Sequence, residues 1–367
     1  MIVGLDARKL RDGGIGTYIR GLLGALAEAP RGHEFVALVD PADQGSVARA
    51  DGRVREVPVR AGKYGFGEHV VVPRSARRAG VELLHEPHYT LPLGWRGPAV
   101  VTIHDLIHVR FPQFFPAGAA LYARAMAGLA VRRARLVLTD SEDARNDVVE
   151  LLGAHPGDVR VIPLGVSPVF ARRAPDEIAT CLEKRSLPTG YLLYVGARKP
   201  HKNLPLLFEA LARIRATERP PLVLSGAPWG AGDPLARLAG RLGLAGVVHV
   251  AGDLRDEQAL ARVYSGAALY VQPALTEGFG LPPLEAMACG TPVLSSNGGA
   301  LPESTGDAAE LLPPRDPDAW ALTITALLGD TARRAELVRR GIVRSRLFTW
   351  ERTAERTMAI YEEAAAR

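Results

Sequence analysis

The sequence predicts an α/β protein made of two Rossmann-like domains that face each other across a cleft. The chain has 367 residues, which exceeds the usual size of a single hydrophobic core. Short apolar runs alternate with helical patterns along almost its whole length. Near-continuous apolar strands separated by helices are typical of parallel sheets covered on both faces. The runs fall into two series, so we expect two such sheets.

Each series supplies six candidate strands. The first consists of residues 2–6, 34–39, 82–86, 99–105, 135–140 and 159–163. The second consists of residues 191–196, 221–226, 247–252, 268–273, 292–296 and 309–313. Between the first two strands, residues 17–29 place leucines at helical spacing, which predicts a helix there.

The two series are separated by residues 165–190, which are rich in Pro, Arg and Ala and have poor periodicity. We interpret this stretch as an inter-domain linker. The expected domains are residues 1–168 and 169–348. Residues 349–367 predict a final helix, with Thr349 as its N-cap and Glu351 in its first turn.

Composition restricts the class of protein. The net charge of +5 is spread evenly along the chain, whereas nucleic-acid binders usually concentrate positive charge; no nucleic-acid partner is expected. No apolar run reaches the roughly 18 residues that span a bilayer, and the N-terminus lacks a signal-peptide pattern. A cytoplasmic location is expected, with the inner face of the membrane as an alternative. The separated Cys181 and Cys289 predict buried free thiols.

The first motif is GGIGTY, which follows the first strand. Glycines at Gly14 and Gly16 would let the backbone approach a ligand, and a helix N-terminus attracts anions. A purely structural turn is the alternative. The motif lacks the G-x-G-x-x-G order of a dinucleotide site, although Asp40 ends the second strand.

The second motif is YVGARKPHKN, which follows the first strand of the second domain. Arg198 and Lys202 at this loop-to-helix junction suit a diphosphate. The planar guanidinium of Arg can donate two parallel hydrogen bonds, and the ammonium of Lys is a compact positive charge. The chain has 40 arginines and only five lysines, yet Lys199 and Lys202 lie together. In a chain that uses arginine for nearly all its basic side chains, a lysine at this position suggests that the geometry of the lysine side chain is needed. The alternative is a solvated basic turn.

The third motif is TEGFGLPPLEAMACGTPV. It places Glu277 in a loop after a strand and Glu285 one turn into a helix, with the amides of Phe279, Gly280 and Leu281 between them. Two carboxylates at this separation can accept hydrogen bonds from the hydroxyls of two sugar rings, and the amides offer an anion cradle. Helix capping by the two acids is the alternative.

Histidines gather after strands of the first domain: His85, His88, His104 beside Asp105, and His108. A zinc site needs three or four converging ligands, and no accompanying pattern supports one. Polar contacts to substrate are favoured over metal binding, with structural roles as the alternative. His104 is the expected substrate contact.

The segment FPQFFPAGAALYARAMAGLAVRRAR, residues 111–135, combines aromatic residues with a basic helix. It could touch a membrane or a lipid-linked substrate. A helix packed on the core with a basic outer face is the favoured interpretation.

Taken in order, these motifs resemble those of the retaining glycosyltransferases of family 4, which have the GT-B fold. The resemblance covers nearly the whole chain, and its most specific parts are VGARKPHKN and EGFGLPPLEAMACGTPV followed by SSNGGALPE. The front half, with HEPHYTLP and TIHDLIHVRFPQFFP, is similar to bacterial mannosyl- and related hexosyltransferases.

The resemblance implies a role for each domain and for each candidate residue. Residues 1–168 would bind the acceptor, and residues 169–348 would bind the nucleotide-sugar donor. Glu285 would bind the ribose, and Glu277 the transferred sugar. Arg198 and Lys202 would hold the diphosphate, which Gly14 and Gly16 would approach. His104 would lie near C6 of the sugar. The backbone from Val250 through Asp253 to Leu254 would contact the base, and the last helix would cross back onto the first domain.

The implied reaction transfers a hexose from a nucleotide diphosphate sugar to a glycan or lipid-linked hydroxyl. GDP- and UDP-hexoses are the candidate donors, mannose the candidate sugar, and neither a metal nor another cofactor is expected. The alternatives are a sugar-nucleotide 2-epimerase of the same fold and a non-catalytic sugar-nucleotide-binding partner. A nicotinamide dehydrogenase is disfavoured by the missing glycine pattern.

Overall fold

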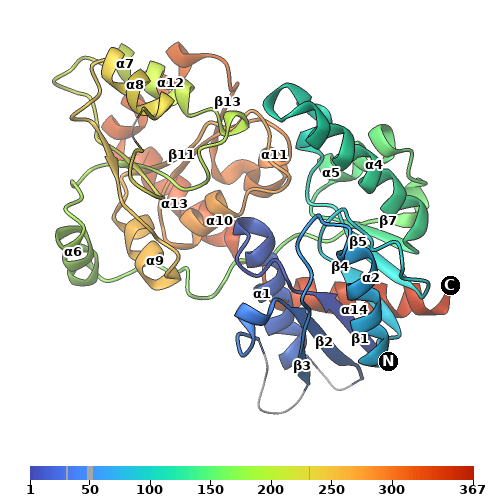
Figure 1. Ribbon diagram of the computed structural model, residues 1–367. Helices are drawn as coiled ribbons and strands as arrows, with labels where there is room; N and C mark the ends of the chain where they lie inside the picture. Colours follow the sequence, from blue (N-terminus) through green and yellow to red (C-terminus); the bar gives the residue numbers. More distant parts are fainter. Residues whose placement is uncertain (30–31, 48–52, 231) are drawn as a thin grey trace. The chain divides into compact units, whose positions relative to one another are not determined.

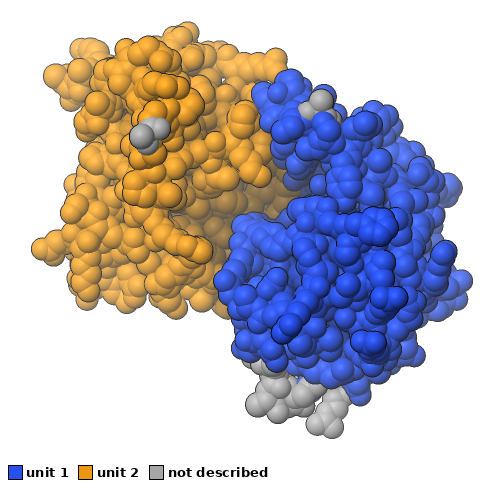
Figure 2. Space-filling view, in the orientation of Figure 1, with its two compact units in different colours: residues 1–165, 349–367 blue, residues 166–348 orange. Residues whose placement is uncertain are grey.

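The computed structural model of the protein describes residues 1–29, 32–47, 53–230 and 232–367. These residues form two compact units (Figure 2). Unit 1 comprises Met1–Gly165 together with Thr349–Arg367, and unit 2 comprises Val166–Phe348. The first boundary thus follows residue 165, where the sequence analysis expected it after residue 168.

Unit 1 contains a parallel seven-stranded sheet in the order β3-β2-β1-β4-β5-β6-β7. Its strands are β1 (Ile2–Asp6), β2 (Glu34–Val39), β3 (Val54–Pro58), β4 (Leu83–Glu86), β5 (Ala99–Thr102), β6 (Leu136–Thr139) and β7 (Val159–Val161). The prediction of six strands missed β3. Its sequence VREVP is not an apolar run, because an edge strand that pairs only with β2 needs few buried side chains.

Helices flank this sheet, with α1 directly after β1. The helices of unit 1 are α1 (Gly13–Glu28), α2 (Glu68–Arg78), α3 (Ile107–Arg110), α4 (Ala117–Arg133), α5 (Glu142–Leu152) and α14 (Trp350–Ala366). Strands β4, β5 and β6 are buried along their whole length. Helix α4 packs small residues against the core, since Ala120, Ala123, Ala127 and Ala130 are buried, while Leu121 is exposed.

Unit 2 contains a parallel six-stranded sheet in the order β10-β9-β8-β11-β12-β13. Its strands are β8 (Leu192–Tyr194), β9 (Leu222–Leu224), β10 (Val248–Val250), β11 (Leu269–Gln272), β12 (Val293–Ser296) and β13 (Glu310–Leu312). All six lie within the predicted runs. The helices are α6 (Pro175–Lys184), α7 (Leu204–Arg213), α8 (Pro234–Arg241), α9 (Glu257–Gly266), α10 (Leu281–Ala288), α11 (Leu301–Thr305), α12 (Pro317–Gly329) and α13 (Thr331–Ser345).

The stretch 165–190 is not a simple linker. It contains α6, which packs against α9 within unit 2 and buries Cys181 and Leu182. Only these few buried positions face the unit, so the segment lacked an obvious apolar stripe. Both Cys181 and Cys289 are buried free thiols, as predicted.

The last helix, α14, belongs to unit 1, although it follows all of unit 2 in the chain (Figure 1). Thr349 caps it by accepting a hydrogen bond from the amide of Arg352. It packs against α1, where the Trp350 ring lies against Gly21, and the Tyr361 hydroxyl is 2.7 Å from Nδ1 of His85. The predicted α/β class with two parallel sheets is confirmed, as is the return of the final helix to the first domain.

Within the described ranges, no helix is both long and apolar enough to cross a membrane.

Candidate functional site

Glu285 lies on α10 with its carboxyl group buried in unit 2. Its Oε2 accepts a hydrogen bond of 2.8 Å from the hydroxyl of Tyr264 on α9. Burial raises the pKa of Glu285 to about 7, although the bond from Tyr264 acts in the opposite direction. The acid is therefore poised between its two protonation states near neutral pH. It is not a helix-capping group, because α10 begins four residues before it.

Glu277 lies in the loop after β11 and is held by two side chains. The ammonium of Lys202 donates to both of its carboxylate oxygens, at 2.6 and 2.7 Å, and the amide of Gln272 donates to Oε1 at 2.6 Å. The side chains of Lys202 and Glu277 are 19% and 10% exposed. This ion pair is thus largely shielded from water and fixes both groups at the carboxyl edge of the sheet.

A second loop supports the backbone of Glu277. The amide of Ala300 donates to the Glu277 carbonyl at 2.9 Å. Gly299 has a φ of +61°, and a Cβ there would lie 2.5 Å from the same carbonyl oxygen. The tight approach explains why glycine occupies this position in the motif SSNGGALPE.

Arg198 and Lys202 share the segment between β8 and α7. The guanidinium of Arg198 lies over the Trp229 ring, 4.9 Å from its centroid. Its Nη1 is buried and has no hydrogen-bond partner among the described residues. The junction itself is rigid, because Asn203 Nδ2 donates to the carbonyls of Pro273 and Pro314 at 3.0 and 2.8 Å.

Free backbone amides lie between the two acids. Gly280, with a φ of +101°, is the N-cap of α10. Among the described residues, the amides of Phe279, Gly280 and Leu281 find no acceptor in the backbone or in a side chain. The first amides of a helix carry a partial positive charge and attract anions. The two acids are thus accompanied by donors suited to a phosphate.

The loop after β10 is fixed by contacts to its backbone. The Arg185 guanidinium donates to the carbonyls of Ala251 and Asp253 at 3.1 and 3.5 Å. The Asp253 side chain is exposed and pairs with Arg255, whereas Leu254 is buried and Val250 half-buried. The expected contact of this backbone with a base stays a prediction.

In unit 1, Gly14 and Gly16 lie in the first turn of α1, because the helix begins at Gly13 rather than at residue 17. Gly14 is exposed, and a Cβ there would meet no described heavy atom within 4 Å. Gly16 is buried, and a Cβ there would collide with the Leu10 carbonyl. Gly16 thus has a packing role of its own, and of these two glycines it is Gly14 that leaves open space for a ligand.

His104 is held by two acceptors. Its Nδ1 is 2.7 Å from Asp140 Oδ2, and its Nε2 is 3.2 Å from the Pro87 carbonyl oxygen. Burial would lower the pKa of His104, but the Asp140 carboxylate raises it above its usual value. Both ring nitrogens are therefore engaged within unit 1. The expected contact of His104 with a sugar stays a prediction.

His85 has a structural role. It lies inside β4 and is fully buried, and its ring nitrogens bond to Tyr361 and to Thr102, each at 2.7 Å. The expectation of a substrate contact is wrong for this histidine, because both nitrogens connect α14 to the sheet. Among the residues that the structure describes, no three His, Cys, Asp or Glu side chains converge to hold a metal ion.

The structure brings Lys202 and Glu277 into contact, which the sequence analysis did not predict. Three supporting residues were also missed: Gln272, Tyr264 and Trp229. Gln272 could have been noticed as a polar residue at the end of the apolar run ALYVQP. Tyr264 and Trp229 come from other elements and left no local signal.

Comparison with known proteins identifies the family. Residues 12–170 match the family model described as Glycosyltransferase Family 4, and residues 184–344 match the model described as Glycosyl transferases group 1. The O-antigen chain mannosyltransferase B of Escherichia coli is 33% identical over 283 residues, which cover 76% of this chain and 74% of that protein.

The chain belongs to the family 4 glycosyltransferases.

Solved structures agree with this assignment at the level of the fold. Sucrose-phosphate synthase from Thermosynechococcus elongatus superimposes with a TM-score of 0.82 at 24% identity, covering 100% of this chain and 99% of that chain. The HepE protein of Anabaena, in complex with UDP-glucose, gives 0.79 at 20% identity, with 99% of both chains covered. This glycosyltransferase therefore has the GT-B fold and is a hexosyltransferase similar to bacterial mannosyltransferases.

Proposed function

We propose that this glycosyltransferase moves a hexose from a nucleotide diphosphate sugar to a hydroxyl of a glycan or lipid-linked acceptor, with retention of anomeric configuration. One observation carries the proposal: the Lys202–Glu277 pair and the buried Glu285 flank the free amides that begin α10. This set offers donors for a diphosphate and acceptors for two groups of hydroxyls.

Each part of the donor has a suitable partner in unit 2. Glu285 can accept hydrogen bonds from ribose hydroxyls, and Glu277 from hydroxyls of the transferred sugar. The unpartnered Nη1 of Arg198 and the ammonium of Lys202 can bind diphosphate oxygens. The names of the similar proteins support a nucleotide sugar, since the HepE structure contains UDP-glucose. Mannose is our proposed sugar because the E. coli relative is named a mannosyltransferase.

The proposed chemistry places charge where this site can stabilise it. As the bond between the anomeric carbon and the diphosphate oxygen breaks, negative charge grows on the diphosphate and positive charge on the sugar. Arg198, Lys202 and the α10 amides stabilise the leaving group, and losing one such contact typically costs about 3 kcal/mol. The acceptor hydroxyl attacks from the face that the diphosphate leaves, and its proton passes to a diphosphate oxygen.

The ion pair with Glu277 has a further consequence for Lys202. Its ammonium is already oriented before the donor binds, so little side-chain entropy is lost on binding. Gln272 also holds the carboxylate, by donating to Oε1. Glu277 thus positions the lysine and keeps one lone pair, on Oε2, for a sugar hydroxyl.

The test is to measure GDP and UDP affinity and turnover with Lys202→Ala. We expect turnover to fall by roughly 10²–10³ because a leaving-group contact is lost. The free energy of unfolding should fall by about 3–5 kcal/mol, because Glu277 loses its buried partner.

The matched control is Lys184→Ala, which removes an exposed lysine on α6 and should change neither quantity. An unchanged turnover rate in the Lys202→Ala enzyme would remove Lys202 from the proposed mechanism. If neither GDP nor UDP bound the unmodified protein, the proposed donor class would be wrong.

A further inference from the structure

Two polar side chains lie inside a buried strand of unit 2. Strand β11 lies between β8 and β12 and is buried along its whole length. Its residues Tyr270 and Gln272 are 0% and 1% exposed, and they lie on the same face of the strand because they are two positions apart. Burying polar groups costs free energy unless they form hydrogen bonds. A reason other than apolar packing is therefore needed for both residues.

The two side chains form a chain of hydrogen bonds that ends at Glu277. The Tyr270 hydroxyl donates to Gln272 Oε1 at 3.1 Å, and Gln272 Nε2 donates to Glu277 Oε1 at 2.6 Å. A second acceptor for the hydroxyl, the Val195 carbonyl, is farther away at 3.5 Å. The Glu277 carboxylate only accepts, so the amide turns its nitrogen toward the carboxylate and its oxygen toward a hydroxyl that donates. Tyr270 thus orients the amide of Gln272.

These bonds occupy most of the acceptor positions of Glu277. Each oxygen of a carboxylate accepts about two hydrogen bonds. Oε1 accepts from Lys202 and from Gln272, both at 2.6 Å, whereas among the described residues Oε2 accepts only from Lys202, at 2.7 Å. One position, on Oε2, is therefore open. Without the donor of Gln272, each oxygen would have an open position, and the carboxylate could accept hydroxyls from two directions.

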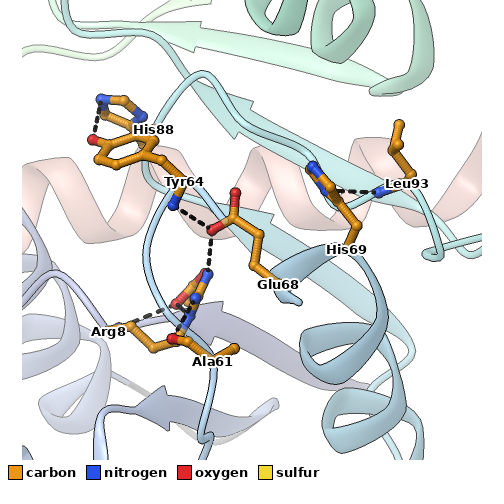
Figure 3. Close-up of polar contacts among 8 residues, drawn as sticks. Arg8, Ala61, Tyr64, Glu68, His69, His88 and Leu93 are labelled. Atoms are coloured by element: carbon orange, nitrogen blue, oxygen red, sulfur yellow. Dashed lines mark hydrogen bonds and ion pairs between the residues drawn. The ribbon is translucent and has the colours of Figure 1, made fainter. Parts of the chain in front are cut away.

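A buried carboxylate of unit 1, that of Glu68, shows a different arrangement (Figure 3). Its Oε2 accepts from the Arg8 guanidinium at 3.3 Å and from the Tyr64 amide at 3.1 Å, while its Oε1 has no partner among the described residues. That group is held at one oxygen. Glu277 is held at both, so the plane of its carboxylate is fixed and its open position points in one direction. A group held in this way selects a hydroxyl by the position of that hydroxyl.

We propose that Gln272, oriented by Tyr270, determines which hexose the donor site accepts. The inference rests on the proposed function, in which Glu277 binds a hydroxyl of the transferred sugar. Because Gln272 occupies Oε1, Glu277 accepts one hydroxyl from one direction. A hexose that carries this hydroxyl in the opposite configuration loses a hydrogen bond to a charged group, and such a loss discriminates between ligands. Gln272 and Tyr270 are positioning residues, because they act through Glu277.

Support of the fold alone is the competing explanation. A network that served only the fold would be expected to pair every acceptor of its buried carboxylate. This network leaves a position open on Oε2 of Glu277, whose side chain is 10% exposed. The two explanations also predict different results. Loss of a structural network would weaken all donors by the same factor, whereas loss of the Gln272 donor would change the ratio between donors.

Calorimetric titration of the full-length protein with epimeric pairs of sugar nucleotides tests the proposal without any acceptor. The pairs are UDP-glucose with UDP-galactose and GDP-mannose with GDP-glucose, and the members of each differ at one hydroxyl. We expect the unmodified protein to prefer one epimer of at least one pair by about tenfold or more. Gln272→Met removes the donor at similar side-chain length. It should reduce this ratio by about fivefold or more, because the second epimer can now bond to Oε1 of Glu277.

Tyr270→Phe is a second variant, which keeps the ring and its packing in the strand. It removes only the hydroxyl, so the Gln272 amide can turn over, and the ratio should fall as in Gln272→Met. The matched control is Tyr191→Phe, which removes another buried hydroxyl, one that donates to the Val263 carbonyl. The control should leave the ratio unchanged. Affinity for UDP and GDP, which lack the sugar, should change in none of the three variants.

The outcomes separate this proposal from the proposed function. An unchanged ratio in Gln272→Met and Tyr270→Phe, whether or not all donors bind more weakly, would overturn this proposal and leave the proposed function intact. Equal affinity of the unmodified protein for both epimers of each pair would also overturn it. Failure of the unmodified protein to bind any sugar nucleotide would defeat the proposed function and this inference with it.

Discussion

At the scale of single residues, the two acids of unit 2 are similar in sequence context but differ in their environments. Glu277 is neutralised by Lys202, whereas Glu285 has only the hydroxyl of Tyr264. Burial without a cation is why the pKa of Glu285 rises to about 7. The two carboxyl groups can therefore respond differently to pH.

This difference predicts a pH dependence of donor binding. If ribose hydroxyls bind the ionised form of Glu285, affinity for the nucleoside diphosphate should fall about tenfold between pH 8 and pH 6, as the group protonates through its pKa of about 7. Calorimetric titration across this range measures the effect. The Glu285→Gln variant should bind more weakly and lose this part of the pH dependence.

Tyr264→Phe provides a matched comparison, since the lost hydrogen bond stabilises the ionised form. Its transition should move to higher pH, and an unmoved transition would contradict the role of Glu285. The same pKa has a consequence for stability. Because folding raises it from 4.5, the contribution of Glu285 to stability is fully present below pH 4.5 and is lost as the pH rises through about 7.

Replacement by alanine should affect stability differently at the two glycines of the first motif. Gly16→Ala should lower the free energy of unfolding by about 1–3 kcal/mol, because the new methyl group meets the Leu10 carbonyl. Gly14→Ala should leave stability unchanged or raise it slightly, since the position is open and helical. If Gly14 approaches the donor, this stable variant should nevertheless lose turnover. Denaturant unfolding and turnover assays measure both effects. Full activity in Gly14→Ala would indicate that the glycine motif serves only to pack the helix and does not approach the donor.

At the scale of elements, the buried strands could be predicted from sequence, because a strand covered on both faces is apolar throughout. All six strands of unit 2 lie within the predicted runs. The edge strand β3 and the helix α6 were missed, since each buries few side chains and leaves a weak pattern. The candidate site was located by residues that follow strands, whereas Gln272, Tyr264 and Trp229 were found only through three-dimensional contacts.

The packing of the final helix, α14, against α1 should contribute to the stability of unit 1. Trp350 is 6% exposed and packs on Gly21 of α1, so Trp350→Ala should lower the free energy of unfolding by about 3–5 kcal/mol. The exposed Glu355 on the same helix is the control, and Glu355→Ala should change it by less than about 0.5 kcal/mol. Denaturant unfolding measures both. Equal effects would contradict a stabilising role of the buried face of α14.

At the scale of the whole molecule, the chain forms two units with separate sheets and cores, and unit 1 is completed by the last residues of the chain. The donor groups that we propose are concentrated in unit 2. The motifs of unit 2 therefore indicate the donor but not the acceptor.

The central claim is hexose transfer from a nucleotide sugar with retention. The most direct measurement is NMR of the product formed from GDP-mannose, UDP-glucose and related donors with a glycan acceptor. The account predicts a new glycosidic bond with the anomeric configuration of the donor, formed only when acceptor is present. An inverted product would contradict the proposed mechanism, and a converted nucleotide sugar without acceptor would indicate an epimerase instead.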